Sequence, residues 1–374
     1  WIASAATALS ALLGGLIAGW LLPVIELPAP SGPYPVGIVD RELRDPARNR
    51  RLMVSVWYPA AASGPPAPLT DHPAEIADGL GAALGVPALA FQHLGYISLA
   101  ASAGAHGDPL AGAAAGAPFP ILVFSHGMTG LRLQSAPMLQ ELASQGYVVV
   151  AIDHTDAAAV TVFPDGEAAF FSLERFGVAG DPGSPGYGRA VDERVFPAWV
   201  ADQRFVYDTL ADWAASDPLL AGKLDIGRIG SLGHSFGGAT ALEVCRVDPR
   251  CRAAVNLDGG LYGAMRSQPA TRPLLLMTAE GSADNAAAMA GWEAMVKRAQ
   301  APAYWQELPG SNHLSFTFAQ LLSPLLAPGD YDPRAGLRTI DRQLRGFFDQ
   351  HLRGTPGRIF APQPGAGDVR WRSP

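Results

Sequence analysis

Charged residues are scarce in this chain. They make up 16% of its 374 residues, against 48% hydrophobic residues, and Lys223 and Lys297 are its only lysines. The net charge of −7 leaves no basic face for nucleic-acid phosphates, so we expect no nucleic acid among its partners. A composition this apolar also excludes a disordered chain and predicts a large buried core.

Cysteine is almost absent as well. Cys245 and Cys251 cannot build a metal cluster by themselves, and no C-x-x-C motif occurs, so we expect no metal and no other cofactor. The two cysteines stand close together, where a helix is expected to end and a strand to begin. They would form a short-loop disulfide in an exported protein or serve as two small buried hydrophobic residues, and the sequence leaves both interpretations open.

Residues 1–25 contain no charged residue at all. Crossing a bilayer takes ~20 apolar residues, so this stretch predicts a membrane anchor that holds the rest of the chain at the membrane, on its extracytoplasmic side. A signal peptide, which would leave a secreted protein, is the alternative, although the apolar run is long for one and no basic start is visible. The proline-rich residues 26–35 are expected to be an extended linker.

From residue 36 to residue 374, apolar strand patterns alternate with helical ones. Strands are expected at residues 36–41, 52–58, 119–124, 147–152, 228–232, 252–257, 273–278 and 303–308. Helices are expected at residues 71–101, 131–145, 192–215, 236–247, 286–299 and 337–352. The alternation predicts an α/β architecture, a mostly parallel sheet with helices on both faces, with insertions at about 60–118 and 155–190.

One five-residue motif carries the strongest chemical signal. Gly233-His234-Ser235-Phe236-Gly237 matches G-x-S-x-G, in which a serine sits on a sharp strand-to-helix turn with its hydroxyl exposed. In a chain with 42 glycines such a match can be a plain glycine-rich turn. Here it follows an expected strand and opens an expected helix. It therefore predicts an α/β-hydrolase fold with Ser235 as the nucleophile.

The order of residues in this fold restricts the general base. The acid and then the histidine follow the serine, and His313 and His351 are the two histidines after Ser235. His313 stands in the loop after the last expected strand, where a base can reach the nucleophile. His351 belongs to the final expected helix and resembles a solvated residue. We therefore predict that His313 is the base.

The acid is less certain from the residues alone. Asp258 directly follows the strand expected at 252–257, whereas Glu280 and Asp284 follow the next strand. Either strand end can supply the carboxylate that holds the imidazole tautomer, so chain order leaves the alternatives open. Asp258 would otherwise be a turn-capping carboxylate.

The oxyanion hole needs two backbone N–H donors. In this fold one comes from the residue after the nucleophile, here Phe236, and the other from a loop after an earlier strand. Met128 is the best candidate for the second donor, because Ser125-His126-Gly127 leads to it from the end of the strand expected at 119–124. We interpret His126 itself as structural rather than catalytic.

Several of these segments resemble the plasma and type II intracellular platelet-activating-factor acetylhydrolases. The similar segments are residues 124–127, 151–156, 229–240, 311–313 and 316–318. The spacing from Ser235 to Asp258 and to His313 is similar too. The resemblance implies that Asp258 is the acid, that Phe236 and Met128 donate to the oxyanion, and that the chain is a bacterial relative. It also implies a calcium-independent serine esterase that releases short or oxidised acyl chains from phospholipids.

Other functions remain open. A polyester hydrolase or cutinase shares the serine motif but expects its aspartate after the strand at 273–278, where Ala279 to Asp284 match loosely. A general lipase or esterase, an acyltransferase and an inactive membrane-tethered scaffold are further alternatives. The segments 71–101 and 155–188 either cover the site and hold an acyl chain or pack as an extra layer on the sheet.

Overall fold

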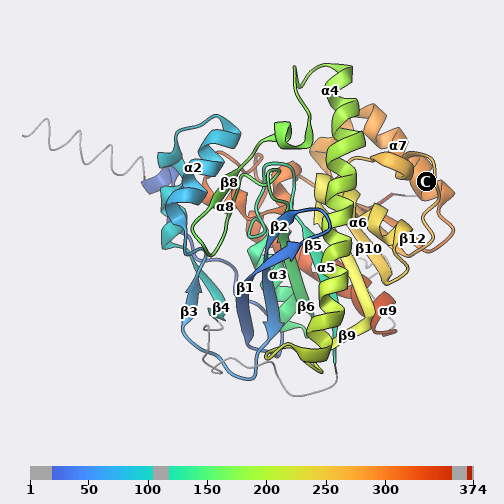
Figure 1. The fold of residues 1–374 in the computed structure, drawn as a ribbon. Helices are drawn as coiled ribbons and strands as arrows, with labels where there is room; N and C mark the ends of the chain where they lie inside the picture. The colour runs from blue at the N-terminus through green and yellow to red at the C-terminus, as the bar shows by residue number, and fades with distance from the viewer. Residues whose placement is uncertain (1–18, 104–117, 356–368, 373–374) are drawn as a thin grey trace, which may run out of the picture.

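A mostly parallel sheet organises the molecule. The computed structural model describes residues 19–103, 118–355 and 369–372, and Figure 1 shows their arrangement. Within these ranges one eleven-stranded sheet has the order β13-β12-β11-β10-β9-β5-β6-β2-β1-β4-β3. The predicted α/β fold with helices on both faces of the sheet is confirmed.

The six central strands run parallel. They are β5 (Phe119–Ser125), β6 (Val148–Asp153), β9 (Leu224–His234), β10 (Cys251–Leu257), β11 (Leu274–Ala279) and β12 (Ala303–Leu308). Each overlaps a strand that the sequence predicts, and β9 begins earlier than expected. Their carboxyl ends share one edge of the sheet, which is where ligand sites form in open α/β sheets.

The N-terminal side of the sheet is mixed, with mostly antiparallel pairs and one parallel pair. β1 (Val36–Asp45) and β2 (Arg50–Pro59) form a hairpin, and β2 pairs with β6 in the antiparallel direction. At the other end, β13 (Arg370–Trp371) pairs antiparallel with β12. The hairpin strands are longer than predicted because their polar outer residues still pair along the ladder.

The helix predicted over 71–101 is wrong in its second half. α2 (Pro73–Leu84) ends at Gly85, whose φ of 69° is readily adopted by glycine. A 3₁₀ segment, η1 (Ala88–Tyr96), follows Pro87, and then β4 (Ser98–Ala103) pairs with β1 and with β3 (Pro66–Pro68). Apolar spacing alone did not separate these short elements from one long helix.

The helices cover the two faces of the sheet in two groups. α3 (Ala136–Ser144) and α9 (Pro333–Leu352) pack with one core cluster. α5 (Phe196–Ser216), α6 (Phe236–Val247) and α7 (Ala286–Arg298) pack with the other. Alternate residues of β5 belong to opposite clusters, Leu122 to the first and Val123 to the second, as the pleat requires.

The insertion after β6 forms short elements. They are β7 (Val160–Val162), β8 (Ala168–Phe170), η3 (Leu173–Phe176), α4 (Pro185–Ala190) and the π-helical turn η4 (Val191–Val195), which leads into α5. Residues of this insertion form a third apolar cluster with Phe236, at the start of α6. The insertion therefore packs next to the serine motif.

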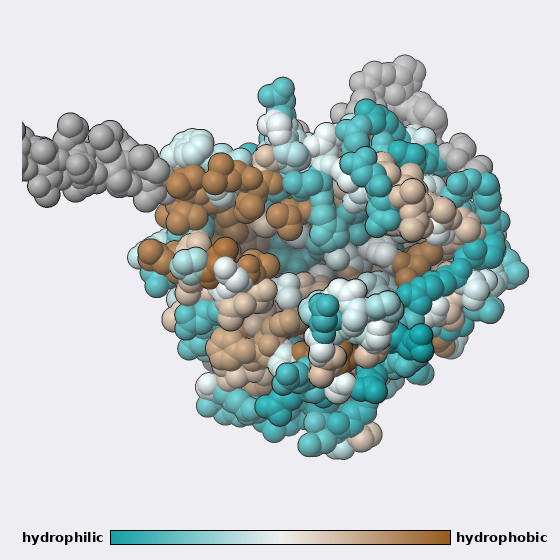
Figure 2. All heavy atoms as spheres, turned by 90° about the horizontal axis from the view of Figure 1, so that it is seen from above, coloured by the Kyte–Doolittle hydropathy of each residue, from teal (hydrophilic) through white to brown (hydrophobic). Residues whose placement is uncertain are grey.

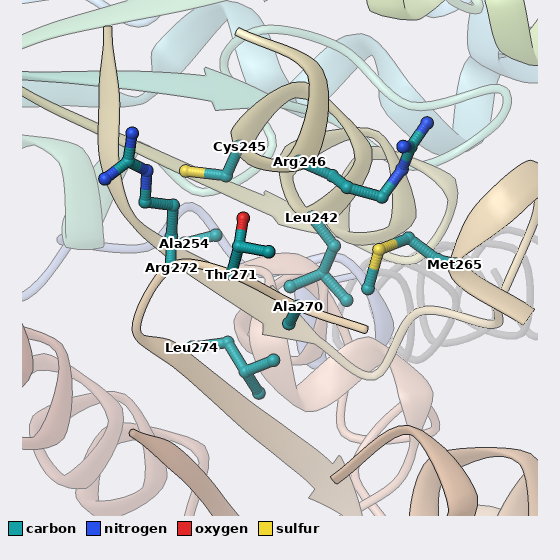
Figure 3. Close-up of a pocket in the computed structure, with 9 residues that line it drawn as sticks. All are labelled: Leu242, Cys245, Arg246, Ala254, Met265, Ala270, Thr271, Arg272 and Leu274. Carbon is teal, nitrogen blue, oxygen red and sulfur yellow. The ribbon is translucent and has the colours of Figure 1, made fainter. Parts of the chain in front are cut away.

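The two cysteines are joined. Cys245 at the end of α6 and Cys251 at the start of β10 form a disulfide with a Cα–Cα distance of 4.9 Å, which decides between the two open interpretations. Figure 3 shows Cys245 beside a cavity of about 10 Å³ between α6 and the segment that leads to β11. Such a space holds about one water molecule and lies away from the carboxyl edge of the sheet.

The predicted membrane anchor falls largely outside the described residues. Residues 1–18 are not described, and residues 19–21 are helical. Across residues 19–103, 118–355 and 369–372, no helix combines the length and the apolar character needed to cross a bilayer.

Candidate active site

Ser235 lies on a strained turn between β9 and α6. Its φ of 56° and ψ of −122° are unusual for a residue with a side chain, and such strain is concentrated at functional sites. Its N–H donates to the Leu257 carbonyl, 2.8 Å away. A β-carbon on Gly233 would collide with the Gly237 carbonyl, and one on Gly237 would collide with the Ser125 carbonyl. Glycine at both places lets strand and helix approach closely enough to form the turn.

His313 is joined to Asp258 by a hydrogen bond. Nδ1–H of His313 donates to Oδ2 of Asp258 over 2.7 Å. Asp258 directly follows β10, and His313 opens η7 (His313–Phe316), which follows β12. The carboxylate also accepts from the Ala279 N–H at 2.9 Å and from the Ser282 hydroxyl at 2.7 Å. These bonds fix the carboxylate and hence the orientation of the ring.

The same contacts set the charge of Asp258. Burial acts to raise the pKa of this carboxyl, but hydrogen bonds from His313, Ala279 and Ser282 outweigh it and leave the pKa below its ordinary value. The acid is therefore ionised at neutral pH and can stabilise a positive charge on the His313 ring.

The other residues considered for these roles lie elsewhere. Glu280, in η6 (Glu280–Asp284), accepts from the Gly310 N–H and pairs with Arg370. His351 packs on α9 between the rings of Tyr304 and Phe347. Within the described part of the chain, Asp258 is the carboxylate that His313 contacts, so the structure brings together the pair that the resemblance implied.

The loop after β5 passes beside the serine. A β-carbon on Gly127 would lie only 3.2 Å from the Ser235 β-carbon. No acceptor among the described residues contacts the backbone N–H of Met128 or of Phe236. At Phe236 this follows from its position in the first turn of α6, where N–H groups have no partner within the helix. Neither of the two predicted donors is therefore bound to an acceptor in the described part of the chain.

His126 holds this loop in place. Its Nε2 accepts from the His154 N–H at 3.1 Å, so the ring proton is on Nδ1, which donates to the Gly127 carbonyl over 2.6 Å. Burial lowers the pKa of His126 to about 4, so the ring is neutral. The N–H of Met128 belongs to the same planar peptide as that carbonyl and points the opposite way. The structural role expected for His126 is consistent with these contacts.

A buried chain of hydrogen-bonded polar residues, which the sequence did not reveal, supports the loop after β5. His154 lies between Ser125, whose Oγ is 3.0 Å from Nε2, and Asp202, whose Oδ2 is 3.1 Å from Nδ1. All three side chains are fully buried, and Arg50 pairs with Asp202 at 2.7 Å. They resemble a catalytic triad in type but have no access to substrate. The sequence signals were the similarity of residues 124–127, which contain Ser125, and of residues 151–156, which contain His154, to the family.

Aromatic rings stand over the first turn of α6. Phe196, Trp199 and Tyr262 pack around Phe236 with ring centroids 5.7, 4.8 and 4.7 Å away. Met128 and the insertion residue Leu173 pack in the same cluster. The insertion at 155–188 therefore packs in one cluster with Met128 and Phe236, the two residues predicted to donate their N–H groups.

A parallel sheet with a strained serine at a glycine-flanked elbow, followed in chain order by a hydrogen-bonded aspartate and histidine, defines an α/β-hydrolase. The sequence matches the family described as "Platelet-activating factor acetylhydrolase, isoform II" over residues 22–170 and 211–353. The chain belongs to this family.

Known proteins resemble the chain over most of its length. A fungal protein of Arthroderma benhamiae, named "Probable 1-alkyl-2-acetylglycerophosphocholine esterase", is 30% identical over 286 residues, which cover 69% of this chain and 65% of that protein. The platelet-activating factor acetylhydrolase of Cavia porcellus is 26% identical over 348 residues, 87% of this chain and 78% of the relative.

A solved structure is similar as well. A ferulic acid esterase from Streptomyces cinnamoneus superposes with a TM-score of 0.74 at 28% identity and covers 93% of this chain and 99% of that chain. The match to the fungal relative spans just under two thirds of that relative's length.

Proposed function

We propose that this protein is a serine esterase in which Ser235, His313 and Asp258 form the catalytic triad. The observation that carries the proposal is the 2.7 Å hydrogen bond between His313 and Asp258. Both residues follow strands at the same edge of the sheet as the strained Ser235. Membership of an acetylhydrolase family supports it.

Hydrolysis proceeds through an acyl-enzyme. Nε2 of His313 takes the hydroxyl proton of Ser235 as Oγ bonds to the ester carbonyl carbon, and the N–H groups of Phe236 and Met128 bind the resulting oxyanion. The intermediate then loses the alcohol, which receives the proton from His313. Water attacks the acyl-enzyme while His313 takes its proton, and the carboxylic acid leaves as Ser235 is reprotonated.

The test is to remove the hydroxyl oxygen of Ser235. Ser235→Ala should reduce hydrolysis of p-nitrophenyl acetate by roughly 10⁶-fold and abolish labelling by a fluorophosphonate probe. Ser216→Ala, at the exposed end of α5, is the matched control and should keep the parent rate. Parent-level hydrolysis by Ser235→Ala would overturn the assignment, and absence of labelling in the parent protein would support the inactive-scaffold alternative.

Phospholipids with short or oxidised acyl chains are the substrates that we propose. The names of the two relatives describe esterases of an acetylated ether phospholipid. Large apolar side chains are also exposed near α2 and η1, among them Leu84, Leu89 and Tyr96 at 55%, 69% and 73%. Figure 2 shows hydrophobic residues gathered over one part of the face seen there. Apolar surface of this kind suits a substrate presented in a lipid aggregate.

A feruloyl-type ester is the second candidate, because the ferulic acid esterase matches 93% of this chain. A panel of esters distinguishes the two. We expect the highest kcat/KM for a phospholipid with an acetyl group at its second position, and a steep fall when that group is lengthened to palmitoyl. A preference for methyl ferulate, or for a soluble polyester, would transfer the proposal to that substrate class.

A further inference from the structure

Gln134 lies between the two loops that serve Ser235. Its side-chain Oε1 accepts from the Gly127 N–H at 3.3 Å, and its Nε2 lies 3.0 Å from Nδ1 of His234. Nε2 of His234 in turn lies 2.9 Å from the carbonyl oxygen of His313. One continuous chain of hydrogen bonds thus runs from the oxyanion loop to the backbone of the proposed base.

The chemistry of the partners fixes the direction of each bond. An amide NH₂ group only donates, so Nδ1 of His234 must accept from Gln134. A carbonyl only accepts, so Nε2 of His234 must carry the proton and donate it to His313. Burial, with a smaller effect from the nearby His313 ring, lowers the pKa of His234 to about 3, so the ring is neutral and has one proton to give. Gln134 thereby selects the tautomer that binds the base-bearing loop.

Backbone bonds reinforce the same junction. The carbonyl of Gln134 accepts from the Phe318 N–H at 3.0 Å, and the Ser135 hydroxyl donates to the Phe316 carbonyl at 3.1 Å. A β-carbon on Gly130 would collide with Oε1 of Gln134, so the loop leaves room for this side chain only because it has glycine there. These two hydrogen bonds therefore hold the C-terminal end of the 3₁₀ turn η7, and the residues just after it, against residues 134 and 135.

We propose that Gln134 and His234 are positioning residues, which hold the His313 loop and the oxyanion loop in register on either side of Ser235. The inference rests on the proposed function. Neither side chain takes part in proton transfer. Their effect is geometric, because misplacing a catalytic group by about 1 Å can cost ~10²-fold in rate.

The test is a double-mutant cycle on p-nitrophenyl acetate. Gln134→Met and His234→Phe should each lower kcat by about 10- to 100-fold while KM changes by less than about threefold. Because both residues act through one chain, the double variant should be no slower than the slower single variant by more than about twofold. His234→Gln, whose amide can still donate to the His313 carbonyl, should recover part of the rate.

Controls separate positioning from folding. Gln350→Met, which removes a hydrogen bond to Tyr304 on α9, should keep the parent kcat. Thermal midpoints and fluorophosphonate titration give the folded, active fraction of each variant. Gln134→Asn retains a neutral amide that is too short to bridge both partners, so it provides the same test if Gln134→Met does not fold.

The outcomes distinguish two kinds of failure. Multiplicative losses in the double variant, a change confined to KM, or parent-level kcat in folded Gln134→Met would overturn the positioning role. If Ser235→Ala were active, the proposed function itself would fail instead. An inactive Ser235→Ala together with a fully active Gln134→Met would remove this inference alone.

Discussion

At the scale of single residues, the site depends on hydrogen bonds that select a protonation state or a tautomer. Asp258 holds His313 through Nδ1, Gln134 holds His234 through Nδ1, and the His154 backbone N–H holds His126 through Nε2. In each case the partner of one ring nitrogen decides what the other nitrogen can do. Each of the three rings is therefore held in one orientation by its own partner.

Replacing the acid tests the first of these bonds. We expect Asp258→Asn to lower kcat by roughly 10⁴-fold, because the amide can donate to Nδ1 and force the tautomer that cannot accept the serine proton. KM should change little. Asp284→Asn, in η6, is the control and should retain parent kinetics. Steady-state kinetics at pH 8 measure both, and a loss smaller than tenfold in Asp258→Asn would move the acid role to another carboxylate.

Buried neutral histidines also predict how stability depends on pH. The pKa of His126 is lowered to about 4 and that of His234 to about 3, mainly by burial, whereas an unfolded histidine titrates near ~6.5. The unfolded chain therefore binds more protons below pH ~6.5, and the free energy of unfolding should fall steadily from pH 7 to pH 4.5.

Urea denaturation at a series of pH values measures this slope. In His126→Asn, one of these buried imidazoles is gone, so the curve should be flatter than in the parent protein over the same range. An equal slope in His126→Asn and the parent would show that His126 does not remain neutral on burial.

At the scale of elements, the start of α6 is where the nucleophile motif and the insertion meet. α5 brings Phe196 and Trp199 to Phe236, and the segment after β10 brings Tyr262. The sequence predicted the insertion but left open whether it covers the site or adds a layer. Its residues pack in one cluster with Met128 and Phe236, which places it at the border of the site.

Removing one of these aromatic rings should change the preference of the enzyme for acyl-chain length. We expect Tyr262→Ala to raise the ratio of kcat/KM for p-nitrophenyl butyrate over acetate by roughly tenfold, because removal of the ring opens space beside the acyl carbon atoms. Tyr96→Ala, on the exposed surface of η1, is the control. An unchanged ratio would indicate that the aromatic cluster is a packing layer and does not limit the acyl chain.

At the scale of the whole molecule, the sheet has an apolar core on each face, and a disulfide joins α6 to β10. Disulfide formation reduces the conformational freedom of the unfolded chain, and the effect is smaller for short loops. The link here spans a sequence separation of 6. It lies at the end of α6 opposite to Ser235, so it bears on global stability and not on the chemistry.

We expect the double replacement of Cys245 and Cys251 by serine to lower the free energy of unfolding by about 2 kcal/mol. Chemical denaturation measures the loss, and reduction of the parent protein with dithiothreitol should reproduce it. The folded double variant should keep the parent kcat on p-nitrophenyl acetate. A kcat loss greater than tenfold in the folded variant would show that the disulfide also shapes the active site.

The sequence by itself determined the local part of this protein. The central strands are continuous apolar runs and the serine motif has glycines where backbones touch, because these features depend on neighbouring residues. Chain order left His313 as the predicted base. The prediction of Asp258 needed more than chain order, since carboxylates follow neighbouring parallel strands and, among the described residues, Asp258 is the one that contacts the ring.

Tertiary structure decided the rest. The strand β4, the Ser125–His154–Asp202 chain and the junction at Gln134 all depend on contacts between residues far apart in the chain. A hydrogen bond between distant side chains leaves no periodic trace in a sequence, because its partners are brought together only when the sheet has assembled.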